Sequence, residues 1–152
     1  MKKILIFSLT LLLFSCGASK NVRSKEKTIK GNWTLTNVNY SNLGNYKITL
    51  FQDESKECFE GSEWRFIPNN NTGTYSIQKT NCNAGIRDFV FVIQETDAAT
   101  GYFSFLLKPD DNENNIGYKV ELKELTENTM LWQQNLTVDG KLFLINMKFI
   151  KQ

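Results

Sequence analysis

Apolar side chains in residues 31–150 tend to alternate with polar ones rather than recur at helical spacing. The apolar runs are short and rich in Val, Ile, Phe, Tyr, Trp and Thr, which is typical of β-strands. Turn-forming residues separate the runs, and Asp139-Gly140 is the sharpest hairpin signal. The pattern predicts nine strands, over residues 32–40, 46–51, 62–67, 73–78, 87–95, 102–108, 117–125, 130–138 and 141–150.

Short connections between consecutive strands predict an all-β fold with antiparallel neighbours. Nine such strands in one domain can close into an up-and-down barrel of eight to nine strands. A sandwich of two sheets uses the same strands and stays open as an alternative. A short helix is expected only within residues 53–61. Several strands, including residues 89–93 and 142–150, are apolar on both faces, so alternation does not say which face points inward.

The N-terminal residues depart from the strand pattern. Two lysines precede an apolar run over residues 4–14, which is too short to span a bilayer and has the length of a signal-peptide core. The run ends in Leu13-Phe14-Ser15-Cys16, which resembles the lipobox of bacterial lipoproteins. This resemblance implies that residues 1–15 are a lipoprotein signal peptide. It also implies that Cys16 carries two or three acyl chains, palmitate or its relatives, which anchor the protein to a membrane.

Residues 16–30 are expected to be a flexible tether after the lipidated cysteine, because Asn, Ser and Lys dominate them. This segment holds five Lys or Arg against Glu26. Its charge either contacts anionic lipid headgroups or serves solubility. Two of the eighteen Lys and Arg lie in the leader, which leaves sixteen against sixteen Asp and Glu. A neutral chain argues against a nucleic-acid partner.

The expected location is the bacterial cell envelope, on the outer or inner membrane. No acidic cluster follows Cys16, and such clusters direct some lipoproteins to the cell surface. A periplasm-facing position is therefore favoured.

Two cysteines are left when Cys16 is assigned to lipid. Cys58 and Cys82 are equidistant from the centre, near residue 70, of the hairpin predicted for residues 62–67 and 73–78. Antiparallel pairing brings residues in such positions together, and an extracytoplasmic compartment is oxidising. The sequence therefore predicts a structural disulfide, with two free thiols as the alternative.

The chain contains no histidine. Its absence excludes Ser-His-Asp and Cys-His catalysis and any zinc site that needs histidine. The sequence also shows no cluster of metal ligands, no phosphate-binding glycine loop and no nucleophile elbow. We expect no enzymatic activity, no metal and no cofactor.

Gly31-Asn32-Trp33 opens the first predicted strand and resembles the Gly-x-Trp motif of the calycin superfamily, in particular the lipocalin-like domains of bacterial lipoproteins. The similarity extends over residues 31–150, and it implies a lipocalin-like barrel domain over residues 31–152. In that family the tryptophan closes one end of the barrel and a basic side chain of the last strand packs across it. The resemblance assigns these roles to Gly31, Trp33 and either Lys148 or Lys151. Further similar segments are Glu57-Cys58-Phe59, Gly61-Ser62 with Trp64, Phe66 to Asn70, Gly73-Thr74-Tyr75, Asn81-Cys82 and Gly117-Tyr118.

The resemblance also implies noncovalent binding of a small hydrophobic or amphipathic ligand. An eight-stranded barrel is either just filled by side chains or holds one small ligand. One of Gln133 and Gln134 should face inward and could orient a polar head group. The alternative is a structural or interaction protein with a filled barrel that presents residues 53–61 and 110–115 to another envelope protein. The candidate ligand-binding residues are Trp64, Phe66, Phe91, Tyr118, Trp132 and Gln134.

Overall fold

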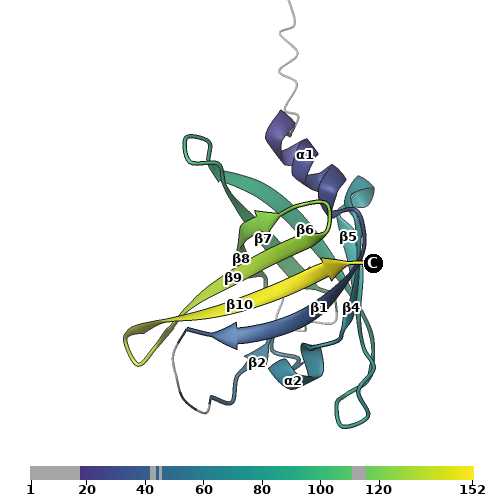
Figure 1. Ribbon diagram of the computed structural model, residues 1–152, viewed down its shortest axis with the longest axis vertical. Coiled ribbons are helices and arrows are strands. Elements are labelled where there is room, and N and C mark those ends of the chain that lie inside the picture. The colour runs from purple at the N-terminus through teal and green to yellow at the C-terminus, as the bar shows by residue number, and fades with distance from the viewer. Residues whose placement is uncertain (1–17, 42–43, 45, 111–115) are drawn as a thin grey trace, which may run out of the picture.

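The computed structural model describes residues 18–152 except 42–43, 45 and 111–115. Eight strands form a closed antiparallel barrel in the order β1-β10-β9-β8-β7-β6-β5-β4 (Figure 1). The all-β up-and-down barrel is therefore confirmed, and the sandwich alternative is wrong. The barrel strands are β1 (Gly31–Tyr40), β4 (Glu63–Ile67), β5 (Thr72–Ile77), β6 (Gly85–Asp97), β7 (Tyr102–Pro109), β8 (Tyr118–Leu125), β9 (Thr129–Val138) and β10 (Lys141–Lys151).

The hairpins follow the turn signals of the sequence. β9 and β10 pair without a break from Val138 opposite Lys141 to Thr129 opposite Ile150. The two residues between these strands, Asp139 and Gly140, have φ angles of 51° and 72°. A two-residue turn whose φ angles are both positive matches the right-handed twist of the flanking strands, which is why Asp-Gly is favoured there.

Burial settles which face of the doubly apolar strands points inward. In β6, Phe89 and Phe91 are at most 1% exposed, whereas Val90 and Val92 are about 40% exposed on the outer face. The aromatic residues therefore face the interior, and the β-branched ones cover the outside. The same alternation runs through β10, where Met147 and Phe149 are buried.

From residue 46 onward, the chain between β1 and β4 folds across one end of the barrel (Figure 1). We call residues 46–60 the lid. It contains β2 (Thr49–Leu50) and β3 (Glu54–Ser55), which pair only with each other, and the helix α2 (Lys56–Phe59). The short helix expected within residues 53–61 is thus confirmed. The strand expected over residues 46–51 forms only at Thr49–Leu50, and its expected place in the barrel sheet is wrong.

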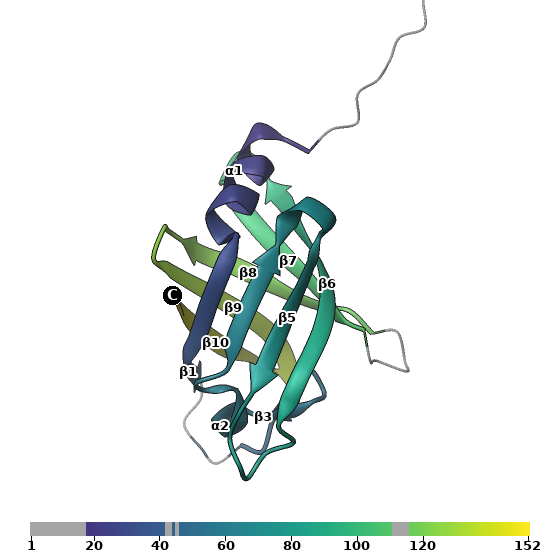
Figure 2. The same ribbon diagram turned by 90° about the vertical axis from the view of Figure 1, so that its right-hand side faces the viewer.

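Helix α1 (Lys20–Ile29) covers the opposite end of the barrel (Figures 1 and 2). The hydroxyl of Ser19 accepts the backbone N–H of Val22 and caps the helix. The flexible tether expected for residues 16–30 is therefore wrong for residues 20–29. Val22 and Ile29 lie seven positions apart on one helix face, and both are buried against the barrel. The prediction used the average composition of the segment, which is polar and gives no weight to the spacing of these two apolar residues.

Cys16, the predicted lipidation site, and the signal peptide predicted for residues 1–15 lie outside the described residues. In the described part of the chain, no helix has the length and apolar character needed to cross a membrane. A 3-10 helix, η1 (Pro68–Asn70), joins β4 to β5 near α1.

A disulfide joins Cys58 of α2 to Cys82, which follows β5, with the two Cα atoms 5.8 Å apart. The predicted bridge is confirmed. The two cysteines are 24 positions apart in sequence, and closing a loop of that length stabilises the fold by about 3–4 kcal/mol on the chain-entropy model. The bond attaches the lid covalently to the connection between β5 and β6.

Candidate functional site

Aromatic rings fill the middle of the barrel. Trp64, Phe66, Phe91 and Trp132, four of the predicted ligand-binding residues, are each at most 1% exposed. Phe105 contacts both Phe91 and Trp132, with ring centroids 4.9 and 4.6 Å away. A ligand reaches these side chains only if the rings move apart. Their packing places any readily accessible site nearer to an end of the barrel.

The end covered by α1, the α1 end, is closed by Trp33. Its indole N–H donates to the carbonyl oxygen of Ile29 at 2.7 Å. The Lys151 ammonium lies 5.2 Å from the centre of the Trp33 ring and donates to the carbonyl oxygen of Thr28. Lys148 is exposed, because its position in β10 alternates with the buried Met147 and Phe149. Of the two basic candidates, Lys151 packs across the tryptophan and Lys148 does not.

Glycine at position 31 is explained by the backbone conformation and not by crowding, since the nearest atom is at an ordinary contact distance. Gly31 has a φ angle of 120°, and a Cβ atom built there would lie 3.5 Å from the Lys151 side chain. The backbone conformation at the start of β1 therefore favours glycine and lets β1 begin directly after α1.

Three rings meet at the opposite end, the lid end. Phe143 of β10 contacts Tyr40 of β1 and Tyr46 of the lid, with centroid separations of 5.2 and 4.8 Å. Tyr40 lies on the inward face, opposite the buried Ile145. Its hydroxyl oxygen is buried and hydrogen-bonds to no described residue. This leaves a polar atom without a protein partner inside an aromatic cluster.

The electrostatic surroundings keep the Tyr40 hydroxyl protonated. Burial raises the pKa of Tyr40, and the negative charges of Glu57 and Glu60 raise it further. The ammonium group of Lys56 lies 5.1 Å from the centre of the Tyr40 ring. A neutral hydroxyl can both donate and accept a hydrogen bond, so Tyr40 suits either a carboxylate or a carbonyl oxygen of a ligand.

Gln134 is the inward-facing member of the glutamine pair. Gln133 points outward and donates to the side-chain oxygen of Asn146 at 2.8 Å. Gln134 lies opposite the buried Ile145, two residues from Trp132 on the same strand face. Its amide is half-buried and has no hydrogen-bond partner in the described part of the chain. The buried indole N–H of Trp132 likewise bonds to no described residue.

Tyr118, the remaining predicted ligand residue, lies next to the lid. Its ring is buried and contacts Phe51, with centroids 5.4 Å apart. Phe51 also contacts Trp64 and Phe59, so its ring fills the lid end of the barrel. Phe51 and Gln52 both have positive φ angles, 54° and 56°. This unusual backbone turn directs the chain into the barrel, and no glycine marks it in the sequence.

An ion pair holds the lid beside Phe51. The Asp53 carboxylate accepts a hydrogen bond from the Tyr75 hydroxyl at 2.8 Å and pairs with the Arg87 guanidinium at 2.9 Å. Burial raises the pKa of Tyr75, and the Asp53 charge and hydrogen bond raise it further, so the hydroxyl stays a donor. Together with the disulfide, these contacts fasten the lid to the β5–β6 side of the barrel. The sequence assigned no role to Asp53 or Arg87 as a pair, since they lie 34 positions apart.

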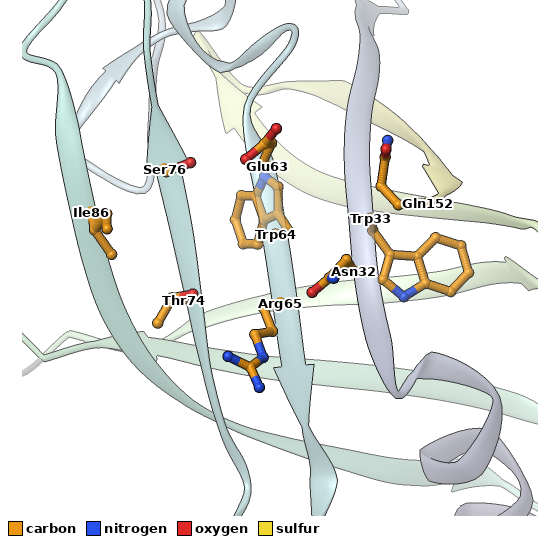
Figure 3. Close-up of a pocket in the computed structure, with 9 residues that line it drawn as sticks. All are labelled: Asn32, Trp33, Glu63, Trp64, Arg65, Thr74, Ser76, Ile86 and Gln152. Atoms are coloured by element: carbon orange, nitrogen blue, oxygen red, sulfur yellow. The ribbon is translucent and has the colours of Figure 1, made fainter.

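A hollow of about 360 Å³ lies on the outer face of β1, β4, β5 and β6. Figure 3 shows Glu63 and Arg65 on β4 beside Thr74 and Ser76 on β5. Glu63 accepts a hydrogen bond from Gln78, while Arg65 is exposed and has no ion-pair partner among the described residues. We call this hollow the outer groove. Its lining residues are Asn32, Trp33, Glu63, Trp64, Arg65, Thr74, Ser76, Ile86 and Gln152.

Across residues 18–152, apart from the gaps given above, no group of three or more Cys, Asp or Glu side chains is placed to hold a metal ion. The acidic residues at the lid end have other contacts. Asp53 pairs with Arg87, and Glu60 accepts the backbone N–H of Val38 at 2.8 Å. The described lid end thus offers hydroxyl, amide and aromatic groups to a ligand.

The family model of the lipocalin-like domain matches residues 29–132, which run from the end of α1 to the middle of β9. This match covers more than half of the chain and agrees with the closed eight-stranded barrel. The chain belongs to the lipocalin-like domain family. No curated protein shows a significant match.

Membership confirms the family resemblance carried by Gly31 and Trp33. A lipocalin-like domain has a fold suited to binding small ligands, because eight strands enclose an interior of about that size. In this lipocalin-like domain the aromatic side chains occupy the middle and α1 closes one end. The partnerless polar groups at the lid end are therefore its candidate binding groups.

Proposed function

We propose that this lipocalin-like domain is a lipid-anchored lipoprotein of the bacterial envelope that binds a small hydrophobic or amphipathic ligand at its lid end. The observation that carries the proposal is the buried Tyr40 hydroxyl, which has no hydrogen-bond partner among the described residues. Buried polar atoms are nearly always hydrogen-bonded in folded proteins, so an exception calls for a water molecule or a ligand atom. The half-buried Gln134 amide, which hydrogen-bonds to no described residue, offers a second polar group on the same inner surface.

The proposed ligand is a fatty acid or a lipid fragment. Its polar head would contact Tyr40 and Gln134, and its apolar part would lie among Phe143, Tyr46 and Phe51. Apolar contact and a few placed polar groups are the usual composition of a small-molecule site. The rings in the middle of the barrel leave room for only a short stretch of the apolar part, so the rest of a long chain such as that of oleate would extend out of the lid end. We propose binding alone, with no bond-forming step.

The proposed anchor would place this binding protein in the envelope. The lipobox-like Leu13-Phe14-Ser15-Cys16 supports acylation at Cys16, and the Cys58–Cys82 bridge suits an oxidising compartment. The proposed location is the periplasmic side of the outer or inner membrane. Mass spectrometry of the N-terminal peptide from protein purified out of bacterial membranes tests this part of the proposal.

Replacing Tyr40 with phenylalanine should separate binding from stability. We expect the free energy of unfolding to stay unchanged or to rise by up to about 1 kcal/mol, because the substitution removes a buried hydroxyl that has no partner. The affinity for oleate should fall about five- to tenfold, which is the effect of losing one ligand hydrogen bond. Chemical denaturation and isothermal titration calorimetry measure the two quantities.

Tyr102→Phe is the matched control, because Tyr102 is 51% exposed on the outer surface. It should change neither stability nor affinity. Oleate affinity that is equal in the wild-type protein and Tyr40→Phe would show that the hydroxyl does not contact the ligand. Native mass spectrometry that finds no lipid bound to protein from bacterial membranes would argue against the function itself.

A second function, a structural or interaction protein of the envelope, is favoured by one specific observation. The middle of the barrel is filled by rings, while the outer groove presents an exposed Arg65 without an ion-pair partner among the described residues. A protein partner with an acidic side chain would fit this groove. The loop over residues 110–115 was also expected to present a surface, but residues 111–115 lie outside the described residues.

A further inference from the structure

Helix α1 is fixed to the barrel along its whole length. Ser19 and Asn21 both hydrogen-bond to the Glu95 carboxylate of β6, at 2.9 and 2.7 Å. At the other end of the helix, Ile29 is fully buried and its carbonyl oxygen accepts the Trp33 indole N–H. The helix therefore has one defined orientation on the α1 end of the barrel, and so do the side chains on its outer face.

The outer face of α1 is basic. Lys20, Arg23, Lys27 and Lys30 are exposed, and none of them forms an ion pair with a described residue. We call these four residues the basic face. Three of them, with Glu26 and residues of η1, line a shallow hollow of about 440 Å³. The four positive charges lie at one end of the molecule, while residues 31–152 carry a net charge of about −4, so this end is suited to a surface of negative charge.

The position of the proposed anchor identifies that negative surface. Cys16 precedes the helix cap Ser19 by three positions, and a fully extended chain spans at most about 11 Å over that separation. Because α1 is fixed to the barrel, acyl chains on Cys16 would keep the start of the basic face, at Lys20, within about one Debye length of the bilayer surface. Lys30, at the other end of the helix, could lie up to about 15 Å farther away. The lid end, at the far end of the barrel in Figures 1 and 2, would then point away from the membrane.

We propose that the basic face is a membrane-docking surface that contacts anionic phospholipid headgroups, so that the barrel stands on its α1 end and opens its lid end to the periplasm. This inference rests on the proposed lipid anchor. Each basic residue near an anionic bilayer strengthens binding about fivefold, so four act together as a substantial orienting force. A long tether would let the barrel turn freely, whereas a short connection to a helix that is fixed on the barrel would keep the α1 end next to the membrane.

Lysine acetylation on vesicles tests this orientation. The full chain is purified from bacterial membranes and reconstituted into phosphatidylcholine vesicles, with or without about 30% phosphatidylglycerol. We expect the acetylation rates of Lys20, Lys27 and Lys30 to fall about threefold or more on the anionic vesicles. Three exposed lysines elsewhere serve as internal controls whose rates should not change. These controls are Lys47, Lys119 and Lys141.

In Arg23→Glu, the slowing of Lys27 acetylation on anionic vesicles, which we call protection, should be reduced by at least half. The substitution removes one positive charge and adds a negative one. Arg65→Glu makes the same change in charge on the barrel wall and should leave the protection intact. The proposal would be overturned if acetylation of Lys20, Lys27 and Lys30 were equally fast on both kinds of vesicle. It would also be overturned if the control lysines were slowed on the anionic vesicles. The mass of the N-terminal peptide reports separately on Cys16. If Cys16 is unmodified, the anchor fails, and co-sedimentation of the protein with the same two vesicles then decides whether the basic face binds.

Discussion

Replacing Trp64 with alanine is expected to lower the free energy of unfolding by about 3–5 kcal/mol, the cost of removing a large aromatic side chain from a tightly packed interior. Trp64 is 1% exposed. Its ring lies 4.6 Å from that of Tyr75 and 5.7 Å from that of Trp132. Its indole N–H donates to the buried hydroxyl of Ser62 at 2.8 Å, so the substitution also leaves that hydroxyl without its donor. Chemical denaturation followed by circular dichroism measures the loss.

Trp64→Phe separates the contribution of ring packing from that of the hydrogen bond to Ser62. Phenylalanine keeps one ring in the cluster and loses the hydrogen bond, so the expected cost falls to about 1–2 kcal/mol. Leu142→Ala is the surface control, because Leu142 is 62% exposed, and it should change stability by less than about 0.5 kcal/mol. A loss below about 1 kcal/mol for Trp64→Ala would mean that the ring does not lie in the packed interior.

Replacing Gly73 with alanine should cost about 3 kcal/mol, although it adds a single methyl group. A Cβ atom at Gly73 would lie 2.3 Å from the Phe89 ring and 2.5 Å from the backbone carbonyl oxygen of Arg65. Phe89 is fully buried among other rings, and the carbonyl belongs to β4, which pairs with β5 at this point. Neither atom has room to withdraw, so the strands must separate or the ring must leave its place.

Gly117→Ala is the matched control for this substitution. The nearest atom to a Cβ at Gly117 belongs to the side chain of Leu106, at 3.6 Å, which is an ordinary contact. Alanine there should be neutral or slightly stabilising, since it restricts the unfolded chain. Thermal unfolding of both variants gives the comparison. Equal melting temperatures for the two would contradict the tight contact between Gly73 and Phe89.

The barrel strands could be predicted because each has one inward face. In β5, alternate residues such as Tyr75 and Ile77 are buried, and the intervening ones are partly exposed. The disulfide could also be predicted, because antiparallel pairing fixes which residues come together, and the observed pairing of Glu63 with Ser76 nearly matches the expected centre. The inward face of β6 could not, because Val90 and Val92 are as apolar as the residues that alternate with them.

Two elements, α1 and the lid, could not be predicted from the sequence, for different physical reasons. Helix α1 depends on only two apolar residues, Val22 and Ile29, which become informative once the barrel offers a surface to bury them. The lid resembles a strand up to Leu50, but Phe51 then turns inward with a positive φ angle that only tertiary packing stabilises. Periodicity reports burial and does not distinguish burial against a neighbouring strand from burial inside the barrel.

The residues of the candidate site also fall into those that the sequence could predict and those that it could not. Alternation correctly limited the inward glutamine to Gln133 or Gln134, and the structure selects Gln134. The aromatic candidates were chosen for size, which finds packed interiors as readily as binding sites, and Trp132 and Phe66 lie in the packed middle. Tyr40 was missed because the only sign that it belongs to a site is that its buried hydroxyl has no hydrogen-bond partner among the described residues. That absence is a property of the folded structure.

Titration of the isotope-labelled protein with oleate, followed by nuclear magnetic resonance, tests the central claim of binding at the lid end most directly. We expect saturable shifts in the backbone amides of Tyr40, Gln134 and Phe143, and none at Ile29 or Trp33 near α1. No saturable shifts, or shifts confined to the outer groove around Arg65 and Thr74, would contradict binding at the lid end.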